Sequence, residues 1–111
     1  MRHNGHKIIV VEDDPGVRRS LEFLLESHGF AVAAFASPED MLMRIDPRDS
    51  ICAIFDVHLP RKNGIEIYEG MRARGGVLPA IFITGQIDDR IRAKARRLEA
   101  IALLEKPFSD E

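Results

Sequence analysis

Apolar residues along this chain gather in five short runs, which are separated by longer stretches where apolar and polar positions follow a helical spacing. The runs contain few polar residues, and such runs are typical of strands covered on both faces, as in a parallel sheet flanked by helices. They span residues 8–11, 31–35, 51–55, 80–84 and 101–104. We therefore predict five buried strands.

Helical patterns fill the four gaps between these runs. Asp14 followed by Pro15 gives a capping residue and a proline at the first helical position, and Ser37 with Pro38 repeats this signal. Gly29 stands just past the end of the first pattern, where a helix commonly stops. The predicted helices span residues 15–28, 38–45, 64–74 and 87–98. Strands alternating with helices, joined by right-handed crossovers, predict an α/β fold with a doubly wound parallel sheet.

Composition narrows the class of protein. A chain of 111 residues with 45% hydrophobic content fits one globular domain with a real core. Its 16 Lys and Arg against 18 Asp and Glu give no domain-wide basic field, so we expect no direct nucleic-acid binding. The one cysteine, Cys52, lies in the third apolar run and is predicted to be a buried, inert thiol. No apolar stretch has the length of a signal peptide or membrane span, so we expect a cytoplasmic protein without membrane contact.

Polar residues follow four of the five predicted strands, at the sheet edge where such folds bind ligands. Neighbouring carboxylates repel one another unless a cation neutralises them, and oxygen ligands of this kind suit Mg²⁺. An ammonium group and a hydroxyl suit an oxyanion such as a phosphoryl group. The residues are Glu12, Asp13, Asp56, Thr84 and Lys106. Together they are the parts of an acyl-phosphate site centred on Asp56.

Each of these residues also has a simpler interpretation. The acidic residues at 12–14 could be a solvated helix start with Asp14 as its cap, Thr84 a strand terminator and Lys106 a surface residue. Five cations crowd the fourth predicted helix, where a solvated face is favoured over a nucleic-acid patch. They are Arg90, Arg92, Lys94, Arg96 and Arg97.

Four motifs in register decide between these interpretations. Residues 11–14 (VEDD), 56–64, 83–85 (ITG) and 105–108 (EKPF) each lie at a predicted strand end. Together they closely resemble the receiver domain of bacterial two-component response regulators, over nearly the whole chain. The resemblance implies one receiver domain over residues 1–111, with a flavodoxin-like sheet of order 2-1-3-4-5. Family members continue into a fifth helix, which is missing here because the chain stops where it would begin.

The resemblance also implies roles around Mg²⁺. Asp56 becomes the phosphoacceptor and a metal ligand, and Asp13 a direct ligand. Glu12 holds the metal mainly through water, and the main-chain carbonyl of His58 is a further ligand. The His58 ring is expected to tune the access of water to the phosphate.

Further roles belong to the switch. Thr84 bonds a phosphoryl oxygen and moves with it, and Lys106 pairs with the phosphate and precedes a cis Pro107. Two positions depart from the family pattern: Leu103 replaces an aromatic residue and Glu99 replaces a glycine. We therefore expect signalling through Thr84 and the loop after it, without the flip of an aromatic ring.

The function implied is that of a receiver that takes a phosphoryl group from a sensor histidine kinase or phosphotransfer protein. The amino-acid sequences of its motifs are most similar to those of receivers that precede LuxR-type helix-turn-helix domains. This resemblance points to transcriptional control by the parent protein. A stand-alone or kinase-fused receiver remains an alternative, and a degenerate binding module is disfavoured because every phosphorylation residue is intact.

Two expectations remain. A Mg²⁺-dependent, flavodoxin-like phosphohydrolase is the alternative from another class, but it lacks an acid two places after Asp56, where His58 stands. Because a fifth helix would cover apolar surface, its absence predicts a chain that associates with itself, as a dimer or by exchange of terminal elements.

Overall fold

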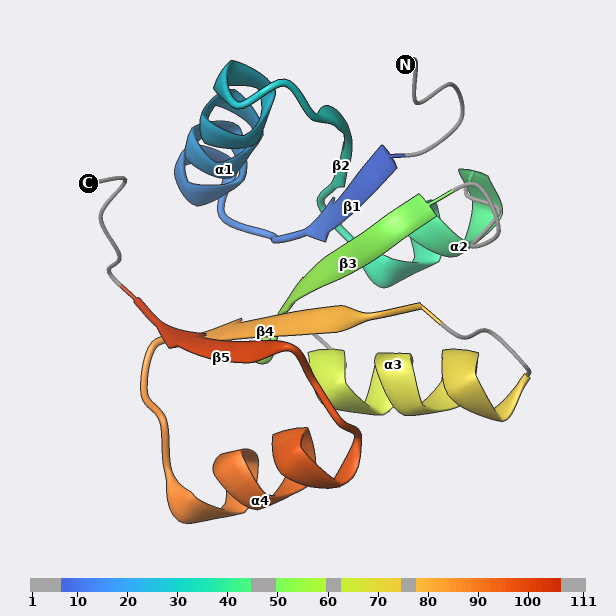
Figure 1. Cartoon of the computed structure of the whole chain (residues 1–111), viewed down its shortest axis with the longest axis vertical. Helices are drawn as coiled ribbons and strands as arrows, with labels where there is room; N and C mark the ends of the chain where they lie inside the picture. Colours follow the sequence, from blue (N-terminus) through green and yellow to red (C-terminus); the bar gives the residue numbers. More distant parts are fainter. Residues whose placement is uncertain (1–6, 45–49, 60–62, 75–77, 107–111) are drawn as a thin grey trace.

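Five parallel strands form a single sheet in the order β2-β1-β3-β4-β5, which confirms the order that the resemblance to receiver domains implies (Figure 1). The computed structural model describes residues 7–44, 50–59, 63–74 and 78–106. The strands are β1 (Lys7–Val11), β2 (Ala31–Phe35), β3 (Ser50–Asp56), β4 (Ala80–Thr84) and β5 (Ala102–Glu105). The helices are α1 (Pro15–Ser27), α2 (Pro38–Arg44), α3 (Gly64–Ala73) and α4 (Asp89–Arg97).

Helices cover both faces of the sheet but unequally. Helices α2, α3 and α4 pack on one face, where side chains of β1, β3 and β4 form the larger part of the core. Among the described residues, α1 is the one helix on the other face, with Leu21 packed against Ile8, Val10, Ile54 and Ile83 (Figure 1). The central strands are thus buried on both sides, which explains their continuous apolar runs.

The face under α1 is incompletely covered near β4 and β5. Ile81 and Cys52 are half-buried there, and Leu104 is 43% exposed. The prediction of a fully buried Cys52 is therefore wrong, because in the part of the chain that the structure describes only α1 covers this side of the sheet. Burial still raises the pKa of the Cys52 thiol above its usual value.

Local capping explains where the helices begin. The Asp14 carboxylate accepts hydrogen bonds from the amides of Gly16 and Val17, and the Ser37 hydroxyl accepts one from Asp40, as predicted. Helix α4 begins at Asp89, two residues later than predicted, because the Asp88 side chain caps it by accepting the Ile91 amide at 2.8 Å. The start predicted from apolar spacing included Ile87, which belongs to the preceding loop.

The register of the strands brings their carboxyl ends together. Val11 of β1 pairs with Phe55 of β3, so that the residues after them lie side by side at one edge. Thr84 of β4 pairs with Glu105 of β5 in the same way. The predicted site residues therefore share one end of the sheet.

Candidate functional site

Three carboxylates meet at the carboxyl ends of β1 and β3. One oxygen from each of Glu12, Asp13 and Asp56 lies within 4.8 Å of the others. Glu12 is fully buried and Asp56 is 3% exposed, whereas Asp13 faces solvent. The acidic cluster predicted from the sequence is therefore present, and the structure adds that two of its members are buried.

Lys106 reaches this cluster from the end of β5. Its Nζ atom lies 2.9 Å from Glu12 Oε1 in an ion pair and donates a hydrogen bond to Asp56 Oδ2 at 3.0 Å. Its backbone amide donates to the Thr84 carbonyl at 2.7 Å, which extends the pairing of β5 with β4. The predicted approach of Lys106 to Asp56 is thus present. One ammonium group offsets only part of the charge of three carboxylates.

The electrostatics of Glu12 reflect this imbalance. Burial raises the pKa of Glu12 to about 7, against the opposing contacts with Lys106 and with the Asp14 amide. Burial alone would lower the pKa of Lys106, but its contacts with Glu12 and Asp56 outweigh this effect and leave the pKa raised. The buried carboxylate is therefore short of positive charge.

A cation fits these residues. Glu12 Oε1 is buried and accepts no hydrogen bond of good geometry from any described residue, although Lys106 lies beside it. The donor set at the cluster is entirely oxygen, which suits Mg²⁺. A divalent ion would neutralise the charge that Lys106 leaves uncompensated.

The loop after β1 is held from two sides, by contacts that sequence reasoning missed. Arg18 Nη1 donates to the Glu12 carbonyl at 2.8 Å and reaches the Asp13 carbonyl at 3.4 Å. The Asp14 amide donates to Glu12 Oε2 at 3.0 Å. Arg18 lies one helical turn beyond the Asp14 cap, so its position on the first turn of α1 is the only sequence signal for this role.

Thr84 lies at the end of β4 and is fully buried. Its hydroxyl donates to the Gln86 carbonyl at 3.2 Å and accepts the Gln86 amide at 3.3 Å, so it engages the following loop. The same loop is tied to β5, because Glu105 Oε2 accepts the Ile87 amide at 3.0 Å. The residue before Lys106 therefore connects β5 to the loop that contains the Thr84 partners.

Gly64 is a second feature that the sequence did not reveal. It opens α3, and its amide donates to the Val57 carbonyl at 2.9 Å. A Cβ atom at this position would lie 2.2 Å from the Asp56 carbonyl oxygen and 3.2 Å from Phe55 Cβ. Only glycine lets α3 pack so closely under the backbone of Asp56.

Other predicted residues have mixed outcomes. His58 is exposed, and its amide donates to Asp56 Oδ1 at 3.1 Å, while the metal-binding role of its carbonyl stays a prediction. Leu103 is half-buried and packs on the core beneath α4. Its aliphatic side chain occupies the position of the family's aromatic residue, so no aromatic ring is present there to flip. Glu99 has a φ of 58°, the backbone conformation that favours the glycine expected there. The predicted cis peptide at Pro107 lies outside the described residues.

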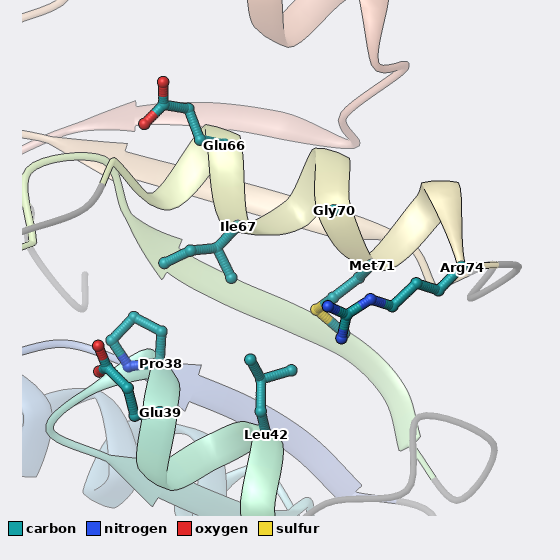
Figure 2. Close-up of a pocket in the computed structure, with 8 residues that line it drawn as sticks. All are labelled: Pro38, Glu39, Leu42, Glu66, Ile67, Gly70, Met71 and Arg74. Atoms are coloured by element: carbon teal, nitrogen blue, oxygen red, sulfur yellow. The ribbon is translucent and has the colours of Figure 1, made fainter.

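A shallow hollow of about 120 Å³ lies apart from this cluster, between α2 and α3 (Figure 2). Leu42 of α2 and Ile67 and Met71 of α3 form its apolar lining, with Glu39 and Arg74 near its two ends. None of the clustered carboxylates lines it. The hollow is therefore separate from the carboxylate cluster.

Comparison with known proteins places this chain in a family. Residues 8–111 match the family model described as the response regulator receiver domain. The chain belongs to this family. As a receiver domain, it is a signalling module with the five-stranded fold described above.

Individual relatives agree with this assignment. The transcriptional regulatory protein FixJ of Bradyrhizobium diazoefficiens is 37% identical over 111 residues, which cover 100% of this chain and 54% of FixJ. FixJ of Azorhizobium caulinodans is 41% identical over 101 residues, covering 91% of this chain and 48% of that protein. The receiver therefore spans about half the length of the curated relatives it matches.

Solved structures show the same architecture. The crystal structure of FixJ-N superposes with a TM-score of 0.79 at 29% identity, covering 95% of this receiver and 84% of that chain. The structure of response regulator StyR gives a TM-score of 0.86 at 34% identity, covering 95% and 53%. None of the helices in the described part of the receiver is long and apolar enough to cross a membrane.

Proposed function

We propose that this receiver accepts a phosphoryl group on Asp56 from a histidine kinase or a phosphotransfer protein. The observation that carries the proposal is the buried Asp56 carboxylate, held 3.0 Å from Lys106 Nζ beside the oxygens of Glu12 and Asp13. A buried carboxylate beside an ammonium group and two further carboxylates is suited to nucleophilic attack on phosphorus. The ammonium group can stabilise the anion that results. The proposed location is cytoplasmic, where such a donor would meet it.

The proposed step transfers one group. An oxygen of Asp56 forms a bond to phosphorus while the bond from phosphorus to the donor imidazole nitrogen breaks, and the imidazole keeps the electron pair and takes up a proton. Lys106 pairs with the phosphoryl oxygens as the charge moves toward Asp56. Asp13 and Asp56 would hold Mg²⁺, with Glu12 acting mainly through water and the His58 carbonyl as a further ligand. The ion, when bound, offsets the charge on the transferred group.

Thr84 carries the proposed response. Its hydroxyl is bonded to Gln86 in the structure and would exchange this partner for a phosphoryl oxygen. That exchange would move the loop at residues 85–88, whose Ile87 amide is bonded to Glu105. The receiver thus catalyses only its own phosphorylation and dephosphorylation, and its output is a change of surface.

Transcriptional control is the proposed output of the parent protein. Support comes from the relatives, because FixJ is named as a transcriptional regulatory protein and this receiver aligns with half of it. A stand-alone or kinase-fused parent would share the same site. Reading the gene beyond residue 111, for a DNA-binding domain or the absence of one, distinguishes these parents.

Labelling with acetyl phosphate tests the phosphoacceptor. Asp56→Asn removes the nucleophilic oxygen with little change of volume, so we expect no labelling and an intact fold. Asp40→Asn, a surface change on α2, is the matched control and should label as the parent does. Labelling that persists in Asp56→Asn would place the phosphoacceptor elsewhere.

Two further measurements test the metal and the reaction class. Asp13→Ala should weaken Mg²⁺ binding and reduce labelling, because it removes the exposed ligand of the cluster. Unchanged Mg²⁺ binding would remove Asp13 from the ligand set. Small phosphate esters should not be turned over, because exposed His58 stands where a phosphohydrolase of this fold needs an acid. Catalytic turnover of such esters would favour the hydrolase.

A further inference from the structure

Arg18 occupies a position that the stability of its own helix does not explain. It is the fourth residue of α1, which begins at Pro15. Backbone amides at a helix N-terminus present partial positive charge, so a cation in the first turn destabilises the helix. The first turn of α1 holds no acidic residue that would offset this cation. The guanidinium of Arg18 therefore gains its stabilisation from contacts outside the helix.

Those contacts lie in the loop after β1. Arg18 is half-buried, and its Nη1 atom donates to the Glu12 carbonyl at 2.8 Å and reaches the Asp13 carbonyl at 3.4 Å. Hydrogen bonds from a charged donor are stronger than those between neutral groups. A single nitrogen atom of the first helix thus engages two consecutive carbonyl groups of the loop that leads into it.

These two carbonyl groups control the backbone of Asp13. They belong to the peptide units on either side of its Cα atom, and each peptide unit is planar. Holding both units fixes the backbone dihedral angles of Asp13, and with them the direction of its Cα–Cβ bond. The second unit is also held at its other end, because the Asp14 amide donates to Glu12 Oε2 at 3.0 Å. The Asp13 side chain therefore leaves the backbone in a fixed direction.

The other two carboxylates of the cluster are held through their own oxygens. Glu12 Oε1 and Asp56 Oδ2 lie 2.9 Å and 3.0 Å from Lys106 Nζ. Asp56 Oδ1 also accepts the His58 amide at 3.1 Å. Among the described residues, no hydrogen bond or ion pair reaches the Asp13 carboxylate, although one of its oxygens lies within 4.8 Å of the other two groups. Its placement in the cluster therefore depends on its backbone.

We propose that Arg18 is a positioning residue for the divalent cation. By holding the peptide units on both sides of Asp13, it presents the exposed ligand of the cluster in the orientation that the cation requires. Mg²⁺ demands near-ideal octahedral geometry, so a misplaced carboxylate lowers its affinity. This role rests on the proposed phosphotransfer function, because that function needs Mg²⁺ beside Asp56.

The charge of Arg18 predicts the opposite effect on the ion. A guanidinium repels a divalent cation, so removal of its charge alone would strengthen Mg²⁺ binding. Loss of its bonds to the loop would weaken Mg²⁺ binding, because the backbone of Asp13 would be released. Removing a group that orients metal ligands typically costs about 10- to 100-fold in metal affinity. The direction of the change therefore separates positioning from charge.

Titration with Mg²⁺, followed by the amide NMR resonances of Asp13 and Asp14, measures this affinity without a phosphoryl donor. Arg18→Gln keeps part of the side-chain stem, but its amide nitrogen ends two bonds short of Nη1. Arg19→Gln removes the same charge from the exposed neighbouring position on α1 and is the matched control. We expect Arg18→Gln to bind Mg²⁺ about tenfold more weakly than the parent, and Arg19→Gln to bind it at least as tightly as the parent. Binding by Arg18→Gln as tight as by Arg19→Gln would overturn the proposal.

The Mg²⁺ dependence of labelling separates positioning from general damage to the fold. Labelling by acetyl phosphate across a range of Mg²⁺ concentrations gives a half-saturating concentration and a maximal rate. We expect Arg18→Gln to need about tenfold more Mg²⁺ for half-maximal labelling and to approach the parent rate at saturation. A lower maximal rate at an unchanged half-saturating concentration would mean a purely structural role and would overturn the proposal.

The two measurements also separate this role from the proposed function. A parent that binds Mg²⁺ but does not label would refute phosphotransfer to Asp56, while the NMR titration would still test Arg18. A parent that labels beside an Arg18→Gln variant with the same Mg²⁺ dependence would refute the role of Arg18 alone. Circular dichroism verifies the fold of both variants.

Discussion

Replacing Gly64 with alanine should damage both the stability and the chemistry of this receiver. The new Cβ would lie 2.2 Å from the Asp56 carbonyl oxygen and 3.0 Å from its carbonyl carbon, and both atoms belong to the backbone. Neither can rotate away as the end of a side chain could. Helix α3 and the end of β3 must therefore separate by about 1 Å to restore ordinary contact.

The expected cost follows from this separation. Overpacking a well-packed site destabilises by about 1 to 3 kcal/mol, and a contact between backbones belongs at the upper end. Alanine regains up to about 1 kcal/mol of helix propensity over glycine, which leaves a net loss of about 2 kcal/mol. A loss of this size lowers the melting temperature of a domain near 100 residues by about 8 to 16 °C.

The site should respond more strongly than the fold. A displacement of about 1 Å at a reacting group can cost on the order of a hundredfold in rate. Gly64→Ala moves the backbone of Asp56 itself, so labelling by acetyl phosphate should slow by about that factor. The assay is a thermal melt followed by circular dichroism, run beside a labelling time course well below the melting temperature.

Gly70 provides the matched control within the same helix. It is exposed, and a Cβ there would meet nothing within 4 Å. Gly70→Ala should therefore raise the free energy of unfolding by about 0.5 to 1 kcal/mol and leave labelling unchanged. If Gly64→Ala is as stable as Gly70→Ala and labels as fast as the parent, the close approach of α3 to Asp56 does not exist.

Three further predictions concern other positions. Glu99→Gly should stabilise the fold by about 1 kcal/mol, because glycine relieves the positive φ and only the long, exposed ion pair with Arg72 is lost. Denaturant titration measures this change, and a destabilised variant would contradict the prediction. Cys52 should react with iodoacetamide at pH 8 more slowly in the folded chain than in the unfolded chain. Burial raises the pKa of its thiol, and a raised pKa leaves less of the reactive thiolate at pH 8. Equal rates would refute this prediction. Glu105→Ala should speed hydrogen exchange of the Ile87 amide several-fold, as the loss of a bond worth about 1 kcal/mol requires, whereas unchanged exchange would mean that this bond does not hold the loop.

The five strands could be predicted from the apolar runs because burial on both faces leaves a direct trace, whereas their order was implied by the resemblance to receiver domains. Ile54 and Phe55 are adjacent in the chain and point to opposite faces of the sheet, and both are buried. A parallel sheet then places the carboxyl ends of its strands at one edge. For this reason the sequence alone assigns Glu12 and Lys106 to one site, although they lie at opposite ends of the chain.

The sequence pattern does not indicate features that depend on how closely two segments of the folded chain approach each other. The position of Gly64 under Asp56 arises from the path of the loop between β3 and α3, and the raised pKa of Glu12 arises from its complete burial. The start of α4 was misplaced because Ile87 continues the apolar spacing, while the capping bond of Asp88 depends on local backbone geometry. Self-association and the extent of the domain stay predictions.

The placement of β1 between β2 and β3 has a consequence for the growing chain on the ribosome. Translation adds roughly 5 to 20 residues each second, so β1 gains β2 early and gains β3 only after Asp56 has emerged. Glu12, Asp13 and Asp56 can therefore assemble about 50 residues before Lys106 emerges, with no ammonium group between them. During that interval the cluster lacks its ammonium partner, so we expect newly made receivers to become competent for phosphorylation only when their last strand joins the sheet.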